Sequence, residues 1–217
     1  MLQAAPSHAF VPDVARRCPH NFTPPETRMN DQPVLVLVAP GFEEIELTAP
    51  VDILRRLGIK VVLAGVQGLS VEGAHGMTLQ ADMLLVDVES AEYRGVILPG
   101  GQGAWLLRDT AAALAVVKDM HKSGKLVAAI CAAPFVLEAA GVLGGRQITC
   151  YPAEAVRRDI SSVRSISEDS VVVDGNIITG RGPGAAMDFG FALGEYLGCS
   201  AQVPQLKKEM CYTSPIH

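Results

Sequence analysis

The sequence predicts a single doubly wound α/β domain, and two observations support this prediction. Short apolar runs rich in Val, Ile and Leu recur along the chain, as is typical of strands buried on both faces. Segments with helical spacing separate these runs, which favours βαβ units and a mostly parallel sheet covered by helices on both faces. The chain has 217 residues, 49% of them hydrophobic, so it can bury such a core without a metal or disulfides.

The elements follow one another in a regular alternation. Strands are expected at Val34–Ala39, Lys60–Ala64, Gly95–Leu98, Leu126–Ile130 and Ile177–Thr179. Apolar spacing and glycine stops predict helices at Glu44–Leu57, Ala111–His121, Ala133–Ala140 and Ala185–Leu197. Two further segments are typical of hairpins: Val71–Leu79, which contains two glycines, and residues 163–179, which turn at Asp174-Gly175.

Residues 1–32 are predicted to be a flexible N-terminal extension, and residues 33–217 the folded domain. The extension contains five prolines and no sustained periodicity. Its arginines suggest a mitochondrial transit peptide in residues 1–28 as an alternative, although the prolines disfavour the amphipathic helix that such a peptide needs. No secretory segment precedes the domain, so a reducing, cytoplasmic location is the simpler expectation.

Composition excludes several classes of function. The net charge of −5 gives no basic footprint for nucleic acid. No apolar run approaches the roughly 18 residues of a membrane span. Five scattered cysteines without a C-x-x-C pair predict neither a disulfide framework nor a zinc site, and the histidines are not spaced as metal ligands.

The glycine-rich segments do not match nucleotide-binding motifs. After Gly100, Gly101 and Gly103, a leucine stands where a dinucleotide fingerprint requires its third glycine. The only Gly-Lys pair, Gly124-Lys125, is followed by leucine, so no phosphate-binding P-loop is present. We therefore expect neither a nicotinamide cofactor nor ATP.

Cys131 is the strongest candidate for a catalytic residue. It directly follows the predicted strand Leu126–Ile130 and precedes small residues that open a helix. This strand–turn–helix arrangement raises a nucleophile above the carboxyl edge of a sheet. The helix dipole is expected to favour the thiolate, and the Ala132 N–H can face a developing oxyanion. A buried structural cysteine is the alternative interpretation.

Two other loops end at the same predicted sheet edge. The turn at Gly100 and Gly101 exposes backbone N–H groups, and Gly101 can supply a second oxyanion donor; a plain tight turn is the alternative. After the first strand, Glu43 and Glu44 are expected to cap the following helix. Glu46 lies one turn further and is expected to point inward, where a buried carboxyl next to the thiol keeps its proton.

Four segments together resemble a known family: GFEEIELTAPVDILRR, VILPGG, AAICAAP and RGPGAA. In this order, over residues 33–200, they are similar to the ThiJ/PfpI superfamily, in the branch of the Parkinson-associated deglycase. The resemblance implies a flavodoxin-like fold, a homodimer, an oxidation-sensitive nucleophilic cysteine and no cofactor. It places that cysteine at Cys131, its protonated glutamate at Glu46 and the oxyanion amides at Gly101 and Ala132. It also implies that Arg181 and Pro183 pack over the site.

The sequence departs from this family pattern at three positions. Tyr151 stands where the closest members carry histidine, and tyrosine is a poor base with a reference pKa of about 10. Glu46 is therefore left as the acid and base. Ala132 stands where the protease and larger chaperone branches carry histidine, which excludes that Cys-His dyad. His75 replaces an arginine that approaches the site, so the handling of anions is expected to differ.

The leading hypothesis is a cofactor-independent enzyme that converts small α-oxoaldehydes, such as methylglyoxal and glyoxal, to 2-hydroxy acids. The same chemistry on early glycation adducts of proteins would reverse them. An oxidisable cysteine equally fits a redox sensor or stress chaperone. A role in thiamine biosynthesis, suggested by the superfamily's name, lacks any phosphate-binding motif. We expect small aldehydes or glycated groups as partners, and neither nucleic acid nor membrane.

Overall fold

The computed structural model describes residues 31–213 and confirms the α/β prediction. A central sheet of seven strands runs in the order β10-β11-β7-β6-β1-β2-β5, and all its neighbours are parallel except β10 and β11. Its strands are β1 (Val34–Val38), β2 (Val61–Gly65), β5 (Met83–Leu84), β6 (Gly95–Leu98), β7 (Leu126–Ile130), β10 (Val171–Asp174) and β11 (Ile177–Gly180). The predicted N-terminal extension and transit peptide lie, except for residues 31 and 32, outside the described residues.

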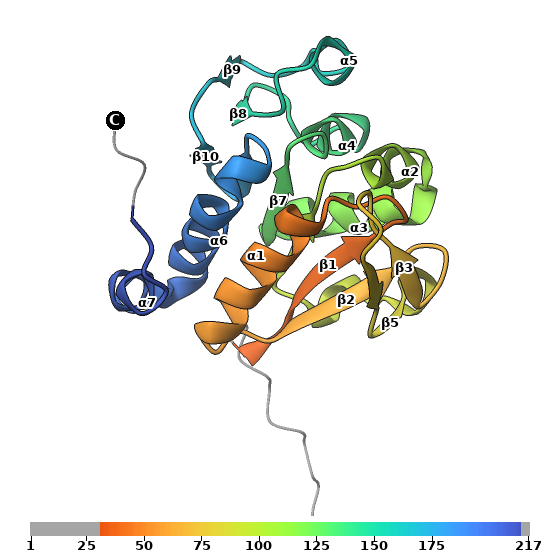
Figure 1. Cartoon of the computed structure of the whole chain (residues 1–217). Coiled ribbons are helices and arrows are strands. Elements are labelled where there is room, and N and C mark those ends of the chain that lie inside the picture. Colours follow the sequence, from red (N-terminus) through yellow and green to blue (C-terminus); the bar gives the residue numbers. More distant parts are fainter. Residues whose placement is uncertain (1–30, 214–217) are drawn as a thin grey trace, which may run out of the picture.

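Helices cover both faces of this sheet (Figure 1). On one face α1 (Glu44–Arg56) packs beside α6 (Ala186–Gly194). A Cβ on Gly190 would lie 2.8 Å from Ile53 Cδ1, so glycine is required for this close helix crossing. On the other face lie α2 (Gly103–Asp109), α3 (Ala111–Lys122) and α4 (Pro134–Ala139). Each face therefore encloses its own hydrophobic core.

Both predicted hairpins are present. Strands β3 (Ser70–Glu72) and β4 (Thr78–Gln80) pair antiparallel outside the main sheet. Strands β10 and β11 pair antiparallel around Asp174-Gly175. The β3–β4 turn approaches the carboxyl end of β1, since the Gly41 N–H donates to the Glu72 carbonyl at 2.8 Å. This contact brings a loop from outside the sheet to the edge where Cys131 lies.

Several elements differ from the sequence prediction. A short parallel pair, β8 (Gln147–Thr149) and β9 (Ser165–Ser167), and helix α5 (Glu154–Arg157) form a layer beyond the carboxyl end of β7 (Figure 1). The predicted helix Ala185–Leu197 ends at Gly194 and continues as a wider turn, Glu195–Cys199, which breaks at Gly198 with φ of 94°. Helix α7 (Val203–Glu209) then follows. No helix of the described residues is long and apolar enough to cross a membrane.

Candidate active site

Cys131 occupies a strained turn at the carboxyl end of β7. Its φ of 64° is in the left-handed region, which costs a residue other than glycine about 1–3 kcal/mol. Two backbone hydrogen bonds hold it there: its N–H donates to the Gly180 carbonyl at 2.9 Å, and its carbonyl accepts from the Tyr151 N–H at 2.8 Å. The predicted strand–turn–helix arrangement is thus present, and its hydrogen bonds to the ends of β11 and β8 fix the direction of the thiol.

Two backbone amides face the sulfur, as the sequence predicts. The N–H groups of Ala132 and Gly101 both interact with the Cys131 thiol. Gly101 has φ of 78°, and a Cβ there would lie 2.4 Å from the Gly41 carbonyl oxygen, so only glycine fits. The Gly100 carbonyl accepts from the Glu43 N–H at 3.1 Å and fixes this loop against the end of β1. The amides are therefore in place before any substrate binds.

Glu46 lies directly behind Cys131 and is fully buried. Its Oε2 accepts a hydrogen bond from the Gly100 N–H at 3.0 Å, whereas Oε1 has no nitrogen or oxygen partner among the described residues. The carboxyl shares a hydrogen bond with the Cys131 thiol. Burial raises the pKa of Glu46 to about 7, and the charge of Glu43 adds to this rise. A carboxyl proton is thus available at neutral pH, as expected from the sequence.

The expectation that the helix dipole makes Cys131 a favoured thiolate is wrong. Burial raises the pKa of the Cys131 thiol, and Glu46 raises it further, while the amides of Ala132 and Gly101 lower it. The following helix α4 has only six residues and begins at Pro134, so its dipole is weak. The repulsion from Glu46 disappears once that carboxyl is protonated. With Glu46 protonated, burial still opposes the thiolate, and the amides of Ala132 and Gly101 offset part of that effect.

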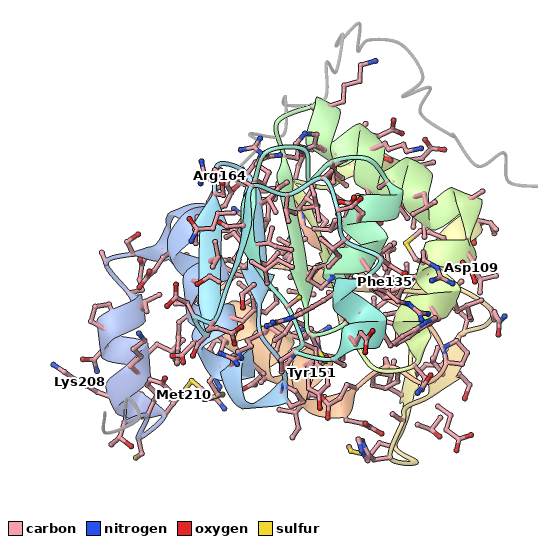
Figure 2. The ribbon with its side chains drawn as sticks, turned by 90° about the horizontal axis from the view of Figure 1, so that it is seen from above. Asp109, Phe135, Tyr151, Arg164, Lys208 and Met210 are labelled. Carbon is pink, nitrogen blue, oxygen red and sulfur yellow. The ribbon has the colours of Figure 1, made fainter. Side chains whose placement is uncertain are left out.

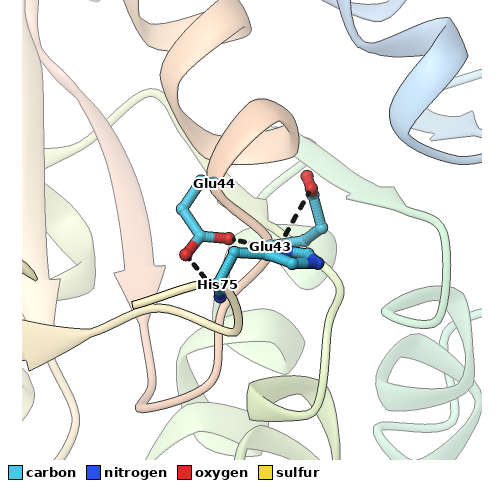
Figure 3. Close-up of side chains that lie close together, drawn as sticks. All are labelled: Glu43, Glu44 and His75. Atoms are coloured by element: carbon cyan, nitrogen blue, oxygen red, sulfur yellow. Dashed lines mark hydrogen bonds and ion pairs between the residues drawn. The ribbon is translucent and has the colours of Figure 1, made fainter. Parts of the chain in front are cut away.

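The rim of the site is a separate cluster of three side chains (Figure 3). Glu43 caps α1 as predicted, because its Oε2 accepts from the Glu46 N–H at 2.8 Å. Glu44 does not cap the helix: its carboxylate accepts from the His75 N–H at 2.7 Å and Nδ1 at 2.9 Å, and from the Met77 N–H at 3.4 Å. Burial opposes ionisation of Glu44, but these hydrogen bonds hold its pKa at about 2. The same pairing raises the pKa of His75.

Cys131 forms part of the wall of a cavity of about 260 Å³. The predicted residues Gly101, Ala132, His75 and Tyr151 also line it. Gly100 lies behind the cavity and bonds to Glu46.

Arg181 and Pro183 do not line this cavity, contrary to the expectation that they pack over the thiol. They line a neighbouring cavity whose wall shares Tyr151. The Arg181 side chain is bound to the carboxylate and carbonyl of Glu168, which draws it away from Cys131. A Cβ on Gly182 would lie 3.3 Å from the Tyr151 ring, so this segment packs against the outer side of that tyrosine.

One group of described residues has the geometry to hold a metal ion. The ligand atoms of Glu43, Glu44 and His75 lie within 4.8 Å of one another. Sequence spacing did not reveal this group, because His75 is 31 positions from Glu44 and approaches it through the β3–β4 turn. Hydrogen bonds from His75 and Met77 already account for the Glu44 oxygens, so the cluster is explained as a clamp on that turn.

Comparison with known proteins agrees with this geometry. The profile of the DJ-1/PfpI family matches residues 32–195. The chain belongs to the DJ-1/PfpI family. Protein dj-1beta of Drosophila melanogaster is 36% identical over 176 residues, which cover 80% of this chain and 94% of the relative. Deglycase TK1284 of Thermococcus kodakarensis is 38% identical over 152 residues, which cover 70% of this chain and 90% of the relative.

Solved structures of DJ-1/PfpI proteins have the same fold. The crystal structure of Drosophila DJ-1beta gives a TM-score of 0.80 at 34% identity, covering 84% of this chain and 99% of that chain. An oxidized DJ-1 of Toxoplasma gondii gives a TM-score of 0.77 at 36% identity, covering 84% and 99%. The flavodoxin-like architecture expected from the family resemblance is thus confirmed.

The sequence analysis missed two residues of this DJ-1/PfpI site. Trp105 on α2 and Val156 on α5 both line the Cys131 cavity. Trp105 could have been identified from its position in the sequence. Helix α2 begins at Gly103, two residues after Gly101, so its first turn lies close to the Gly100–Gly101 loop of the site. Val156 lies in the layer beyond β7 that the sequence did not predict.

Proposed function

We propose that this protein is a cofactor-independent enzyme that uses Cys131 to convert α-oxoaldehydes to 2-hydroxy acids. The observation that carries the proposal is the pairing of a buried Glu46, whose pKa is raised to about 7 by burial, with a thiol that lines an open cavity. The pair supplies a nucleophile and a proton carrier in contact with each other. Membership of a family with a relative named deglycase supports the enzymatic interpretation.

In the first step the sulfur of Cys131 attacks the aldehyde carbon, and the proton that the Cys131–Glu46 pair holds passes to the aldehyde oxygen, which gives a hemithioacetal and leaves Glu46 as a carboxylate. The amides of Gly101 and Ala132 stabilise the oxyanion that forms on the way. Glu46 in its carboxylate form then moves the proton of the former aldehyde carbon to the neighbouring keto carbon, and the hydroxyl proton of the hemithioacetal passes to the keto oxygen. The former aldehyde carbon is thereby oxidised and its neighbour reduced, which gives a 2-hydroxy thioester with no external oxidant.

Water then attacks the thioester, releases the 2-hydroxy acid and restores the thiol. Methylglyoxal gives lactate by this route, and glyoxal gives glycolate. The same steps on hemithioacetals or carbinolamines at Cys, Lys or Arg side chains would remove early glycation adducts. Free aldehydes and glycation adducts can be distinguished as substrates by comparing the turnover of methylglyoxal with that of a preformed adduct in a solution from which free aldehyde has been removed.

The test is the amount of lactate formed from methylglyoxal without glutathione. The wild-type protein is expected to form many equivalents, and Cys131→Ser is expected to form none above the background rate. Cys150→Ser is the matched control, because Cys150 is another buried thiol that does not line the Cys131 cavity. Undiminished lactate from Cys131→Ser, or no turnover by the wild-type protein, would contradict the proposal.

A redox function is the second candidate, and a specific observation favours it. Cys131 is 8% exposed at an open cavity, and its hydrogen-bonded Glu46 can donate a proton to a sulfinate oxygen. A relative of solved structure is described as oxidized. Graded peroxide treatment followed by peptide mass spectrometry is expected to find oxygen on Cys131 before Cys150. Equal oxidation of the two thiols would contradict a sensing role.

We also propose that the protein is a cytoplasmic homodimer. Two large apolar side chains beside Glu44 support an interface there: Ile45 is 53% exposed and Met77 is 60% exposed. Contact with a second copy of the chain would bury these two side chains and remove their apolar surface from water. Light scattering is expected to give twice the chain mass, and Ile45→Glu is expected to shift the protein to monomer. A monomeric wild-type protein would refute the proposal.

A further inference from the structure

One part of the wall of the Cys131 cavity is apolar and aromatic. Trp105 of α2, Tyr151 after β8 and Val156 of α5 line it, together with several alanines. Figure 2 labels Tyr151, which follows β8, and Phe135 of α4, on which Trp105 packs. We infer that this wall is a subsite for an aromatic substituent of the α-oxoaldehyde, so that aryl glyoxals are better substrates than methylglyoxal. This inference rests on the proposed function.

Trp105 is fixed in position as a wall of the cavity. Its ring packs on Phe135, with centroids 4.9 Å apart and an interplanar angle of 52°. Phe135 is buried, and the Arg108 guanidinium lies 5.2 Å from its ring centroid. Aromatic pairs of this kind add to the free energy gained from burial alone. The indole face therefore needs little reorganisation to receive a planar substituent.

The charges around the cavity disfavour an anionic substituent. Among the described residues that line it, only His75 can carry a positive charge, and His75 is bound to Glu44. Arg181 lines the neighbouring cavity and is paired with Glu168. A phosphate or carboxylate beside Trp105 would thus lack a free cation. The apolar wall instead favours an uncharged ring, which removes both its own surface and that of the indole from water.

The size of the cavity also favours a ring over a methyl group. A cavity of about 260 Å³ can accommodate a phenyl substituent, whereas methylglyoxal would leave most of it empty. One additional methylene in an apolar pocket changes the specificity of an enzyme by about 10–200-fold. We therefore expect kcat/KM to be at least about tenfold higher for phenylglyoxal, which gives mandelate, than for methylglyoxal, which gives lactate.

Substitutions on α2 test the assignment of Trp105. Trp105→Ala is expected to lower the phenylglyoxal to methylglyoxal ratio of kcat/KM by about tenfold, and Trp105→Phe is expected to restore most of it. Leu106→Ala is the matched control, because Leu106 is the next residue of the same helix, is partly buried and does not line the cavity. A ratio that is equal in wild type and Trp105→Ala, or that falls equally in Leu106→Ala, would overturn the inference.

A binding measurement separates this inference from the proposed activity. Trp105 is the only tryptophan of the chain, so its fluorescence reports directly on the cavity wall. Mandelate and lactate, which differ only in phenyl against methyl, serve as unreactive probes. Mandelate is expected to change the fluorescence saturably, with a Kd at least about tenfold below that of lactate. Such binding without turnover would refute only the activity, whereas equal Kd values for the two acids would refute the aromatic subsite.

Discussion

Glu44 and Glu46 lie two positions apart on the first turn of α1, yet they have opposite electrostatic properties. Both are buried, with 5% and 0% of their surface exposed. The pKa of Glu44 is about 2, because hydrogen bonds from His75 and Met77 overcome the effect of burial. The pKa of Glu46 rises to about 7, because burial is countered only by the Cys131 thiol and the Gly100 N–H. Two neighbouring carboxyls with little exposed surface thus form a fixed anion at one position and, where burial is deeper, a proton carrier at the other.

The rim of the cavity (Glu43, Glu44 and His75) and its floor (Glu46 and Cys131) differ in depth of burial and in the number of hydrogen-bond donors. At the rim, the β3–β4 turn brings three N–H donors to the carboxylate of Glu44. On the floor, Glu46 receives one N–H donor, from Gly100, and otherwise interacts with the Cys131 thiol. The rim therefore positions a loop of the cavity, and the floor holds the group that moves a proton.

Apart from loss of the thiol itself, the largest effect is expected from Glu46→Gln. This substitution keeps the size of the side chain but removes the acid and base, so kcat for methylglyoxal should fall by about 10²–10⁴-fold. Glu44→Gln is the matched control at the rim. It should lower the free energy of unfolding by about 1–3 kcal/mol, because buried N–H groups lose a charged acceptor. Equal losses of kcat in both variants would contradict the division between floor and rim.

Gly100→Ala should have the next largest effect. A Cβ at this position would lie 2.6 Å from Glu46 Oε2 and 2.8 Å from Cys131 Cβ, so the two floor residues must move apart. A displacement of this kind can cost about 10²-fold in kcat/KM. Gly144→Ala is the control, since a Cβ there meets nothing within 4 Å. Unchanged kinetics in Gly100→Ala would show that the Glu46–Cys131 contact does not determine the rate.

The two carboxyls should also give opposite slopes of stability with pH. Between the ordinary pKa of 4.5 and the folded pKa of about 7, folded Glu46 holds a proton that the unfolded chain has lost, so stability falls as pH rises. Between about 2 and 4.5, the unfolded chain holds a proton that folded Glu44 lacks, so stability rises with pH.

Each slope is at most about 1.4 kcal/mol per pH unit. Denaturant unfolding at a series of pH values should show that Glu46→Gln removes the first slope and Glu44→Gln the second. A first slope that persists in Glu46→Gln would assign it to another group.

His75→Gln should have the smallest effect. The His75 side chain is 72% exposed, and exposed ion pairs contribute about 0–1 kcal/mol. The backbone N–H of residue 75 still donates to Glu44 in the variant. We expect little change in the free energy of unfolding, as measured by denaturant titration at neutral pH. A larger loss would show that the ring, and not the backbone of the turn, holds Glu44 in place.

The main sheet and the floor of the site could be predicted from the sequence, because both depend on local signals. Apolar runs mark β1, β6 and β7, and the position of Cys131 at the end of such a run fixes its place at the sheet edge. The inward direction of Glu46 was expected from its apolar neighbours Ile45 and Leu47, of which Leu47 is buried and Ile45 is 53% exposed.

Local sequence signals do not place the rim and the apolar wall, because both depend on contacts between distant segments; His75 and Tyr151 were indicated by the family resemblance alone. His75 reaches Glu44 only through the β3–β4 turn. Tyr151 and Val156 are placed by β8, β9 and α5, which are short and lack clear periodicity. The pairing of Arg181 with Glu168, which draws the arginine away from the thiol, likewise has no local signal. The raised pKa of the Cys131 thiol reflects burial between layers rather than the helix that follows it.

The central claim is that Glu46 carries a proton next to Cys131 at neutral pH. Infrared difference spectra between wild type and Glu46→Gln, recorded across pH, would test it most directly through the C=O stretch of the protonated carboxyl. The account predicts a protonated-carboxyl band that persists at pH 6 and is lost with a midpoint near 7, in line with the raised pKa of Glu46. A band lost near the ordinary glutamate pKa of about 4.3 would contradict it.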